Sequence, residues 1–337
     1  MRAMVLDQPG EIESAPLQER ELPDPEPGRG EVLVRVEVCG VCRTDLHITE
    51  GELPSHKQPV IPGHEVVGRV AKLGPGCSRL RAGDHIGVAW LHRACGVCEC
   101  CRRGHENLCD SPVFTGYDVD GGYAGFTVAD ERFAYLLPDE LPAATLAPLL
   151  CAGIIGYRSL VRSAVRPGER LGLYGFGASA HIVIQIALHW GCEVYVVSRD
   201  RSHQKLAVEM GATWVGGSGD RPPRKLSSAI LFAPVGELVP EILESLGKGG
   251  TLAVAGIYLT QIPPLDYDRH LFQERDLRSV TANTRQDGEE LLALAAEVPL
   301  HAHTQEFPLG EANEALRHLK HDQISGAAVL RVRSEGA

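Results

Sequence analysis

Residues 170–180 read RLGLYGFGASA, a short apolar run followed by a glycine-rich turn and the start of an apolar segment that reaches Trp190. The run predicts a strand over 170–174, and the segment after the turn predicts a helix over 178–190. The turn carries the small residues of a G-x-G-x-x-A dinucleotide fingerprint, namely Gly175, Gly177, Ala178 and Ala180. Such residues let the backbone approach a pyrophosphate, whose charge the helix N-terminus meets. We therefore expect a nucleotide-binding turn here.

Strands and helices alternate after this stretch. The expected strands are 193–197, 229–233, 251–255 and 277–280, and the expected helices are 202–210 and 237–246. This alternation is typical of a doubly wound parallel sheet, the fold class that we predict for this α/β part of the chain. Helices over 287–297 and 309–321 and a strand over 327–332 are expected to return to the first part of the chain.

The first 150 residues have a different pattern, rich in glycine, proline and short strands. Runs at 31–38, 66–71, 84–88 and 126–129 read as strands between turns. We interpret this part as an irregular β domain that carries metal-binding loops.

Composition sets wide limits. The chain has 337 residues, 44% of them hydrophobic, which suits two globular domains. Its 33 basic and 44 acidic residues give a net charge of -11, which argues against a nucleic-acid partner. We see no apolar run of membrane-spanning length and no signal-peptide core, so we expect no membrane partner and a cytoplasmic location.

The clearest metal signal is a cluster of four cysteines, Cys95, Cys98, Cys101 and Cys109. Four thiolates at this spacing close a tetrahedral zinc site of the structural kind, with no ligand position left for a substrate. The alternative is a set of free buried thiols, which such clustering makes less favourable. Cys100 is a fifth thiol that cannot act as a ligand together with both neighbours.

A second candidate set combines Cys42, His64 and Cys151. Two thiolates and an imidazole make a zinc site with an open position, at which the metal can polarise a substrate oxygen. A lone His or Cys is more often a core residue, so the set depends on its neighbours. Asp45 can hold the far nitrogen of His64, and Glu65 is either a further ligand or a carboxylate beside the metal.

A hydroxyl and an imidazole follow Cys42 on the same short stretch. Thr44 and His47 could pass a proton from the metal site to solvent. The alternative for His47 is an exposed histidine without a role.

The end of the second strand of the parallel sheet bears on the choice of dinucleotide. Ser198 occupies the position at which an acidic residue would bind the ribose of NAD, and Arg199 could pair with the 2′-phosphate of NADP. Asp200 leaves NAD open, because a shift of one residue would make it the ribose-binding acid. We favour NADP.

These motifs together resemble the zinc-dependent medium-chain alcohol dehydrogenases over essentially the whole chain. The matching stretches are CGVCRTDLH at 39–47, PGHE at 62–65, the cysteine cluster of 95–109, GGYA at 121–124 and LCAG at 150–153. The resemblance implies a GroES-like catalytic domain over 1–152 with both zinc sites, a Rossmann domain over 153–280, and a return to the catalytic domain over 281–337.

The same resemblance implies the chemistry. It implies reversible hydride transfer between a nicotinamide cofactor and a primary alcohol, including aromatic ones, or a secondary alcohol. The catalytic zinc is held by Cys42, His64 and Cys151, and Thr44 and His47 relay the alcohol proton. Trp90, Leu91 and Tyr123 match positions that line the substrate pocket. Relatives are dimers or tetramers, so a homo-oligomer is expected.

The chain departs from the family pattern in three places. Ala178 and Ala180 replace glycines of the nucleotide turn, Ile155 replaces a common threonine, and Ala327 replaces a common arginine. Two rival functions stay open on the sequence: a zinc-free reductase of the same superfamily, and a zinc-thiol redox or scaffold protein without a cofactor.

Overall fold

The computed structural model describes residues 1–256, 258–298, 300–324 and 326–332. Its contacts divide the chain into two compact units. Unit 1 comprises 1–151, 282–296 and the residues from 301 onward, and unit 2 comprises 152–281 and 297–300. The end of the predicted segment 281–337, from 333 onward, lies outside the described residues.

Unit 2 is built on a parallel sheet, which confirms the predicted fold class. Among the described residues it has six strands in the order β12-β11-β10-β13-β14-β15. Their bounds are β10 (Arg170–Tyr174), β11 (Glu193–Val197), β12 (Trp214–Gly216), β13 (Leu226–Leu231), β14 (Leu246–Val254) and β15 (Asp276–Ser279). The chain starts in the middle of the sheet and winds outward in both directions, so β10 ends where the strand order reverses.

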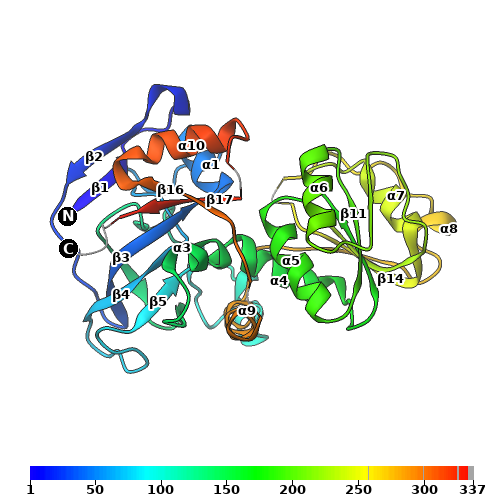
Figure 1. Ribbon diagram of the computed structural model, residues 1–337. Helices are drawn as coiled ribbons and strands as arrows, with labels where there is room; N and C mark the ends of the chain where they lie inside the picture. Colours follow the sequence, from blue (N-terminus) through cyan, green and yellow to red (C-terminus); the bar gives the residue numbers. More distant parts are fainter. Residues whose placement is uncertain (257, 299, 325, 333–337) are drawn as a thin grey trace. The chain divides into compact units, whose positions relative to one another are not determined.

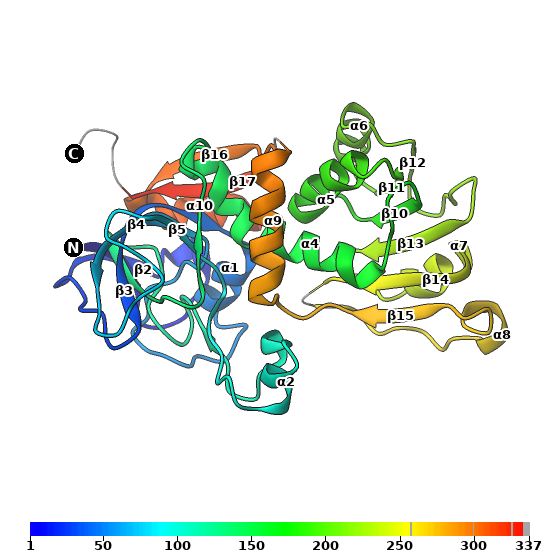
Figure 2. The same cartoon turned by 90° about the horizontal axis from the view of Figure 1, so that it is seen from below.

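Helices cover both faces of this sheet (Figures 1 and 2). They are α4 (Ala152–Ser163), α5 (Ala178–His189), α6 (Arg201–Glu209), α7 (Leu238–Ser245) and α8 (Tyr267–His270). Ala229 and Leu231 pack with the apolar residues of α7, and Ile230, which points to the other face, is also fully buried. A strand buried on both faces explains why β13 shows no polar alternation.

Helix α4 is an element that the sequence pattern did not predict. Two glycines in its first turns hide the helical periodicity. Gly156 is needed where α4 crosses α5, because a Cβ atom there would lie 2.9 Å from Val183 Cγ2 and 3.1 Å from the carbonyl oxygen of Ser179.

Unit 1 contains a mostly antiparallel sheet centred on the long strand β3 (Glu31–Val41). Its strand order is β16-β17-β3-β4-β5-β9, and β8 also pairs with β3. The other strands of this sheet are β4 (Val66–Leu73), β5 (His85–Val88), β8 (Phe126–Asp130), β9 (Ala134–Leu136), β16 (Thr304–Pro308) and β17 (Ala327–Arg331). Two small antiparallel pairs are β1 (Arg2–Leu6) with β2 (Leu17–Glu21) and β6 (Leu91–Arg93) with β7 (Val113–Phe114).

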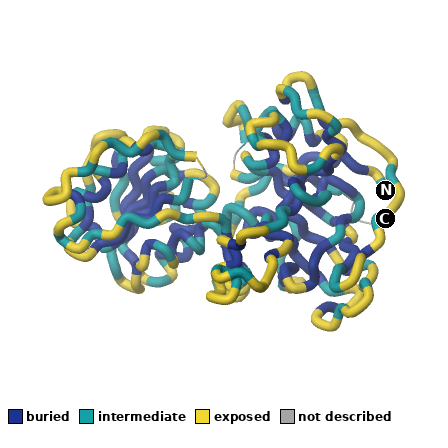
Figure 3. Tube along the Cα trace, turned by 180° about the vertical axis from the view of Figure 1, so that it is seen from behind, coloured by how far each residue is buried: buried dark blue, intermediate teal, exposed yellow. Residues whose placement is uncertain are grey.

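Short helices connect and cover these strands. They are η1 (Ile12–Ser14), α1 (Arg43–Glu50), α2 (Glu99–Arg102), η2 (Glu106–Leu108), α3 (Ala143–Leu146), η3 (Ala147–Leu150), α9 (Arg285–Glu297), η4 (Leu309–Glu311) and α10 (Ala312–Lys320). In unit 1 buried strands occupy the centre and exposed loops surround them (Figure 3).

One local prediction about this unit was wrong. We expected the residues after Cys42 to form a short loop, but they form α1. Cys42 is the N-cap of this helix: its sulfur accepts from the backbone N–H of Thr44, and Asp45 bonds back to the N–H of Cys42. The chain could fold into a helix here because this reciprocal capping satisfies free backbone donors at its start.

Within the described ranges no single helix has the length and apolar composition to cross a membrane, although the bent pair Ala143–Leu150 and Ala152–Ser163 meets both criteria when taken together.

Candidate active site

Four side chains of metal-binding types meet in unit 1 beside the start of α1. The ligand atoms of Cys42, His64, Glu65 and Cys151 all lie within 4.8 Å of one another. His64 Nε2 is 3.2 Å from Cys42 Sγ. His64 and Glu65 are almost fully buried, with 1% and 3% exposure. The structure thus brings together three residues that lie up to 109 positions apart in the chain, with a carboxylate beside them.

Asp45 holds this cluster in place by hydrogen bonds to His64, Gly63 and Cys42. It is completely buried, and its Oδ1 atom accepts from His64 Nδ1 at 3.0 Å and from the backbone N–H of Gly63 at 3.2 Å. Its Oδ2 atom accepts from the N–H of Cys42 at 3.0 Å. Because Nδ1–H of His64 donates a hydrogen bond to this carboxylate, the neutral ring presents the lone pair of Nε2 toward Cys42, as a metal-binding histidine does.

Close packing fixes the loop that carries His64. Gly63 has a φ of +99°, and a Cβ atom there would lie 2.4 Å from the ring of Tyr123. Opposite Glu65, a Cβ atom on Gly40 would lie only 1.9 Å from Oε2 of the glutamate. Gly40 therefore leaves room for Glu65, and Gly63 lets the backbone before His64 pack against Tyr123.

The charges of the cluster are unbalanced without a cation. A hydrogen bond from Cys151 and the imidazole of His64 hold the pKa of Cys42 well below its ordinary value. Burial, together with the charge of Cys42, raises the pKa of Glu65 well above its ordinary value. Burial opposes a charge on His64, but Asp45 and Cys42 outweigh it and raise the pKa of the imidazole. Two thiols and two carboxyl groups around one imidazole fit a divalent metal ion, which would balance their charge.

An aromatic wall stands on one side of the cluster. The indole of Trp90 meets the His64 imidazole edge-on, with ring centres 5.2 Å apart. Phe114 stacks on Trp90 at 4.7 Å with an angle of 14°, and Tyr117 lies 5.8 Å away. The Tyr117 hydroxyl donates to the carbonyl oxygen of Pro54, and this hydrogen bond fixes the position of the Tyr117 ring.

The other two predicted pocket residues are in different surroundings. Leu91 is buried in a small apolar cluster with Cys109 and Phe133. Tyr123 is fully buried in the main core of unit 1. Their role in the substrate pocket stays a prediction, whereas Trp90 directly contacts a side chain of the metal cluster.

The predicted proton path lies along the first turns of α1. Thr44 and His47 are three residues apart on this helix, so they share a face. His47 is partly exposed, and its Nδ1 atom contacts the carboxylate of Glu52. Sequence reasoning missed Glu52 because a helix that ends at a glycine was not recognised there.

The second cysteine cluster also assembles as predicted. The sulfur atoms of Cys95, Cys98, Cys101 and Cys109 lie within 4.8 Å of one another, and among the described residues this group leaves out Cys100. Backbone N–H groups point at the sulfurs, for example those of Val97 and Cys98 at Cys95. These bonds lower the pKa of Cys95 to about 6. Burial instead raises the pKa of Cys101 to about 12. Four sulfur atoms in a closed set suit a structural zinc ion.

The nucleotide turn in unit 2 has the expected form. Gly175 follows β10 with a φ of +91°, and a Cβ atom there would lie 2.8 Å from the nitrogen of Ala233. Gly177 is the N-cap of α5, and nothing lies within 4 Å of where its Cβ would be. Ala178 is the first residue of the helix and Ala180 is fully buried. The backbone at Gly177 is therefore open to a ligand, while Ala180 serves helix packing.

The loop after β11 carries the residues that bear on the choice between NADP and NAD, and Arg199 and Asp200 have different surroundings there. Ser198 is buried, and Arg199 is exposed. The Asp200 carboxylate caps α6 by accepting from the N–H groups of Ser202 at 2.7 Å and His203 at 3.2 Å. The hydrogen bond from Ser202 also lowers the pKa of Asp200. Asp200 is thus committed to its helix.

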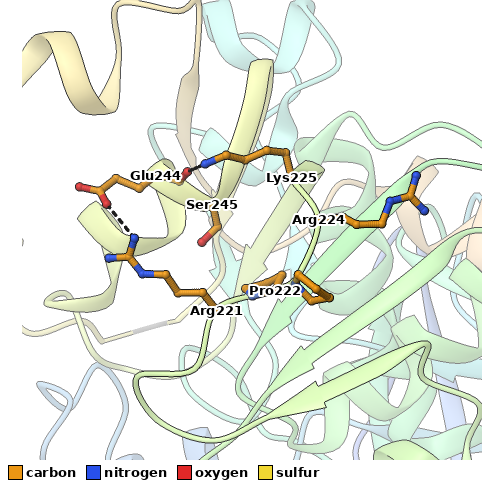
Figure 4. Close-up of a pocket in the computed structure, with 7 residues that line it drawn as sticks. Arg221, Pro222, Arg224, Lys225, Glu244 and Ser245 are labelled. Atoms are coloured by element: carbon orange, nitrogen blue, oxygen red, sulfur yellow. Dashed lines mark hydrogen bonds and ion pairs between the residues drawn. The ribbon is translucent and has the colours of Figure 1, made fainter.

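A small pocket lies at the opposite edge of this sheet, at the start of β13 (Figure 4). It has a volume of about 140 Å³ and is lined mainly by charged residues. Arg221 pairs with Glu244 at 3.3 Å, and Lys225 donates to the carbonyl oxygen of Glu244. The residues that line this pocket include no member of either cysteine cluster and none of the glycine-rich turn, so we do not assign the chemistry to it.

Known families match both units. The alcohol dehydrogenase GroES-like domain matches residues 28–139, and the zinc-binding dehydrogenase family matches residues 180–297. A probable alcohol dehydrogenase AdhA of Mycobacterium tuberculosis is 52% identical over 98% of this chain and 97% of its own length. An alcohol dehydrogenase of Geobacillus stearothermophilus is 35% identical over 95% of this chain and 96% of its own. Among solved structures, a cinnamyl alcohol dehydrogenase from Sorghum bicolor superposes with a TM-score of 0.87 at 27% identity, covering 98% of this chain and 97% of its own.

Proposed function

Because the chain belongs to the zinc-dependent medium-chain alcohol dehydrogenases, we propose that it holds one catalytic and one structural zinc ion. Its activity is that of an NAD(P)-dependent alcohol dehydrogenase on small-molecule alcohols. Cys42, His64 and Cys151 hold the catalytic ion in this proposal. Cys95, Cys98, Cys101 and Cys109 hold the structural ion.

The observation that carries this proposal is the buried cluster itself. Two thiols and an imidazole converge beside a buried carboxyl group, and Asp45 fixes the imidazole so that Nε2 faces Cys42. When bound, zinc would supply Lewis acidity at the alcohol oxygen, and a nicotinamide cofactor would supply the hydride acceptor. Glu65 stays beside the ion as a carboxylate that can approach it.

The chain's own residues handle the proton. Thr44 accepts the proton of the alcohol hydroxyl and passes it on toward His47, which releases it to solvent. The support is their placement on one face of α1 directly after Cys42, together with the partial exposure of His47. Asp45 has a positioning role, since it contacts His64, Gly63 and Cys42 but lies fully buried.

We infer that NADP is the preferred cofactor. Gly175, Gly177 and Ala178 would receive the pyrophosphate, with Ser198 and Arg199 at the 2′-phosphate. Ala180, the last small residue of the fingerprint, is fully buried and would let α5 pack closely. Arg199 is exposed, and a guanidinium group can form a bidentate contact with a phosphate. Asp200, the acid that would favour NAD, is occupied by the N–H groups of α6.

We infer primary alcohols, including aromatic ones, as the main substrates. The stacked rings of Trp90, Phe114 and Tyr117 give a flat, rigid apolar surface beside His64. Such a surface favours planar or narrow groups over bulky secondary alcohols. The name of the cinnamyl alcohol dehydrogenase of Sorghum bicolor agrees with an aromatic substrate class.

Three further expectations remain proposals. The domain division at 152 and 280 is supported by the compact units. The family resemblance supports a homo-oligomer. A cytoplasmic location is supported by the reduced thiols that both metal clusters need.

The test measures zinc content and turnover together. Purified enzyme should contain about two zinc ions per chain, and it should oxidise benzyl alcohol and ethanol with NADP faster than with NAD. Cys42→Ser should lose catalytic zinc and activity but keep the structural ion. Activity without zinc would support the zinc-free reductase, and zinc without cofactor binding would support the thiol scaffold.

A further inference from the structure

The turn that ends α1 brings the carboxylate of Glu52 against His47, the histidine of the proposed proton path. Gly51 ends the helix with a φ of +77°. The backbone N–H of Glu52 then donates to the carbonyl oxygen of His47 at 2.9 Å. This turn folds the chain back, so that the Glu52 side chain reaches Nδ1 of the His47 ring. Glu52 is thus held to His47 at two points, one in the backbone and one in the side chain.

The contact is specific among the acids of this segment. Asp45 is used by His64, and Glu50 accepts from Lys320 at 2.9 Å and from the N–H of Ile12 at 3.0 Å. Glu52 is the carboxylate that faces His47. The neighbouring charged groups of α1 and α10 have other partners, since Arg43 pairs with Asp322.

The hydrogen-bond chemistry determines the state of the ring. An ionised carboxylate can only accept, so Nδ1 of His47 must carry a proton to bond with it. In the neutral ring the lone pair is then on Nε2. We propose that Glu52 is a positioning residue that holds His47 in this tautomer and orientation. The relay proton then enters and leaves at Nε2, and Glu52 itself stays ionised.

This inference rests on the proposed relay for its function but not for its geometry. The geometry alone predicts which ring nitrogen of His47 carries the proton. That property can be measured in zinc-loaded enzyme without alcohol or cofactor.

The first experiment is nitrogen NMR of the enzyme with isotope label in its 14 histidines. The spectra are recorded at about pH 8.5, above the range in which imidazole groups usually titrate. The His47 signal is assigned by its loss in His47→Gln. We expect the Nδ1-protonated pattern in the parent and in Glu52→Gln, whose amide oxygen still accepts. We expect a shift to mainly Nε2-protonated ring in Glu52→Ala. An unchanged pattern in Glu52→Ala overturns the proposal.

The second experiment asks whether the contact matters for turnover. Glu52→Ala should lower kcat for alcohol oxidation by about tenfold, a part of the roughly 10²–10⁴-fold that a positioned acid–base group contributes, with little change in KM. Glu52→Gln should recover most of this loss. Adding Glu52→Ala to His47→Gln should cause no further loss, and a full additional loss would overturn the role through His47.

Glu50→Ala is the matched control. It removes two contacts from the same helix and should lower thermal stability, but it should leave the His47 tautomer and kcat unchanged. A tautomer shift in Glu52→Ala with unchanged kcat would support the positioning contact and instead refute the proposed relay.

Discussion

Gly40→Ala is the sharpest test of how β3 supports the metal cluster. The backbone of Gly40 lies in a strand without a positive φ, so alanine suits its conformation. The added Cβ atom would, however, lie 1.9 Å from Oε2, 2.6 Å from Cδ and 2.8 Å from Cβ of Glu65. The carboxyl group could swing aside, but the Cβ of Glu65 is fixed to the backbone and cannot.

The distances give the size of the effect. Ordinary contact begins at 3.4 Å, so the carboxylate oxygen must move by 3.4 − 1.9 = 1.5 Å and the two Cβ atoms must separate by 3.4 − 2.8 = 0.6 Å. The second movement stretches the hydrogen bond from the N–H of Gly40 to the carbonyl oxygen of Glu65, now 2.9 Å. Overpacking of this kind costs about 1–3 kcal/mol of unfolding free energy. It also shifts the residue next to His64.

The assay combines chemical unfolding with zinc analysis. Gly40→Ala should lower the unfolding free energy by that amount and weaken the catalytic zinc, while the four-cysteine site keeps its ion. Gly125→Ala is the control, since its Cβ would meet only ordinary contacts, at 3.5 Å from Met1 Cβ and 3.9 Å from the carbonyl oxygen of Arg2. If Gly40→Ala were as stable and as rich in zinc as Gly125→Ala, Glu65 would not be held against β3 as described.

Three other changes address the remaining sites. Cys98→Ser should remove about one zinc per chain and lower the melting temperature, as measured by metal analysis and calorimetry; retention of both ions would contradict the closed site. Arg199→Ala should weaken NADP binding by about 1.5–3 kcal/mol and NAD binding far less, and equal losses in titration calorimetry would argue against the 2′-phosphate contact. Burial, with His203 nearby, lowers the pKa of His181 from 6.5 to about 4 in the folded protein. As the pH falls, the unfolded chain therefore takes up this proton first. The contribution of His181 to the unfolding free energy is complete above pH 6.5 and is lost as the pH drops toward 4. His181→Asn should flatten this part of the stability profile measured by urea unfolding, and an unchanged slope would refute the assignment.

Regular patterns made much of the fold predictable. β11 was expected over 193–197 and is found there, because its apolar residues are bounded by turns on both sides. Helix α4 was missed because its glycines serve packing against α5, a tertiary requirement that no local pattern displays. Helix α1 was taken for a loop because its N-cap is a cysteine, which is not among the usual capping residues.

The contrast between local sequence patterns and tertiary packing also separates the predicted from the unpredicted residues of the site. Cys42, His64 and Cys151 were found from residue chemistry, since few other roles explain such a set. Phe114 and Tyr117 were missed, although an aromatic pair shortly before the glycines at 121–122 was a signal that could have found them. Their role depends on stacking against Trp90 from a neighbouring strand, and spacing in sequence does not encode that contact.

The distribution of the proposed ligands along the chain would give a catalytic ion a second effect. Cys42 directly follows β3, His64 lies shortly before β4, and Cys151 follows η3, 109 positions after Cys42. An ion bound to all three closes a long loop, and the binding free energy adds to the stability of the folded state. Without the ion, the buried acidic groups Asp45 and Glu65 would face the thiol groups with a single imidazole to offset them. Loss of the metal therefore removes both the Lewis acid and the charge balance that keeps these loops together, so zinc removal should loosen unit 1 around His64 as well as abolish turnover.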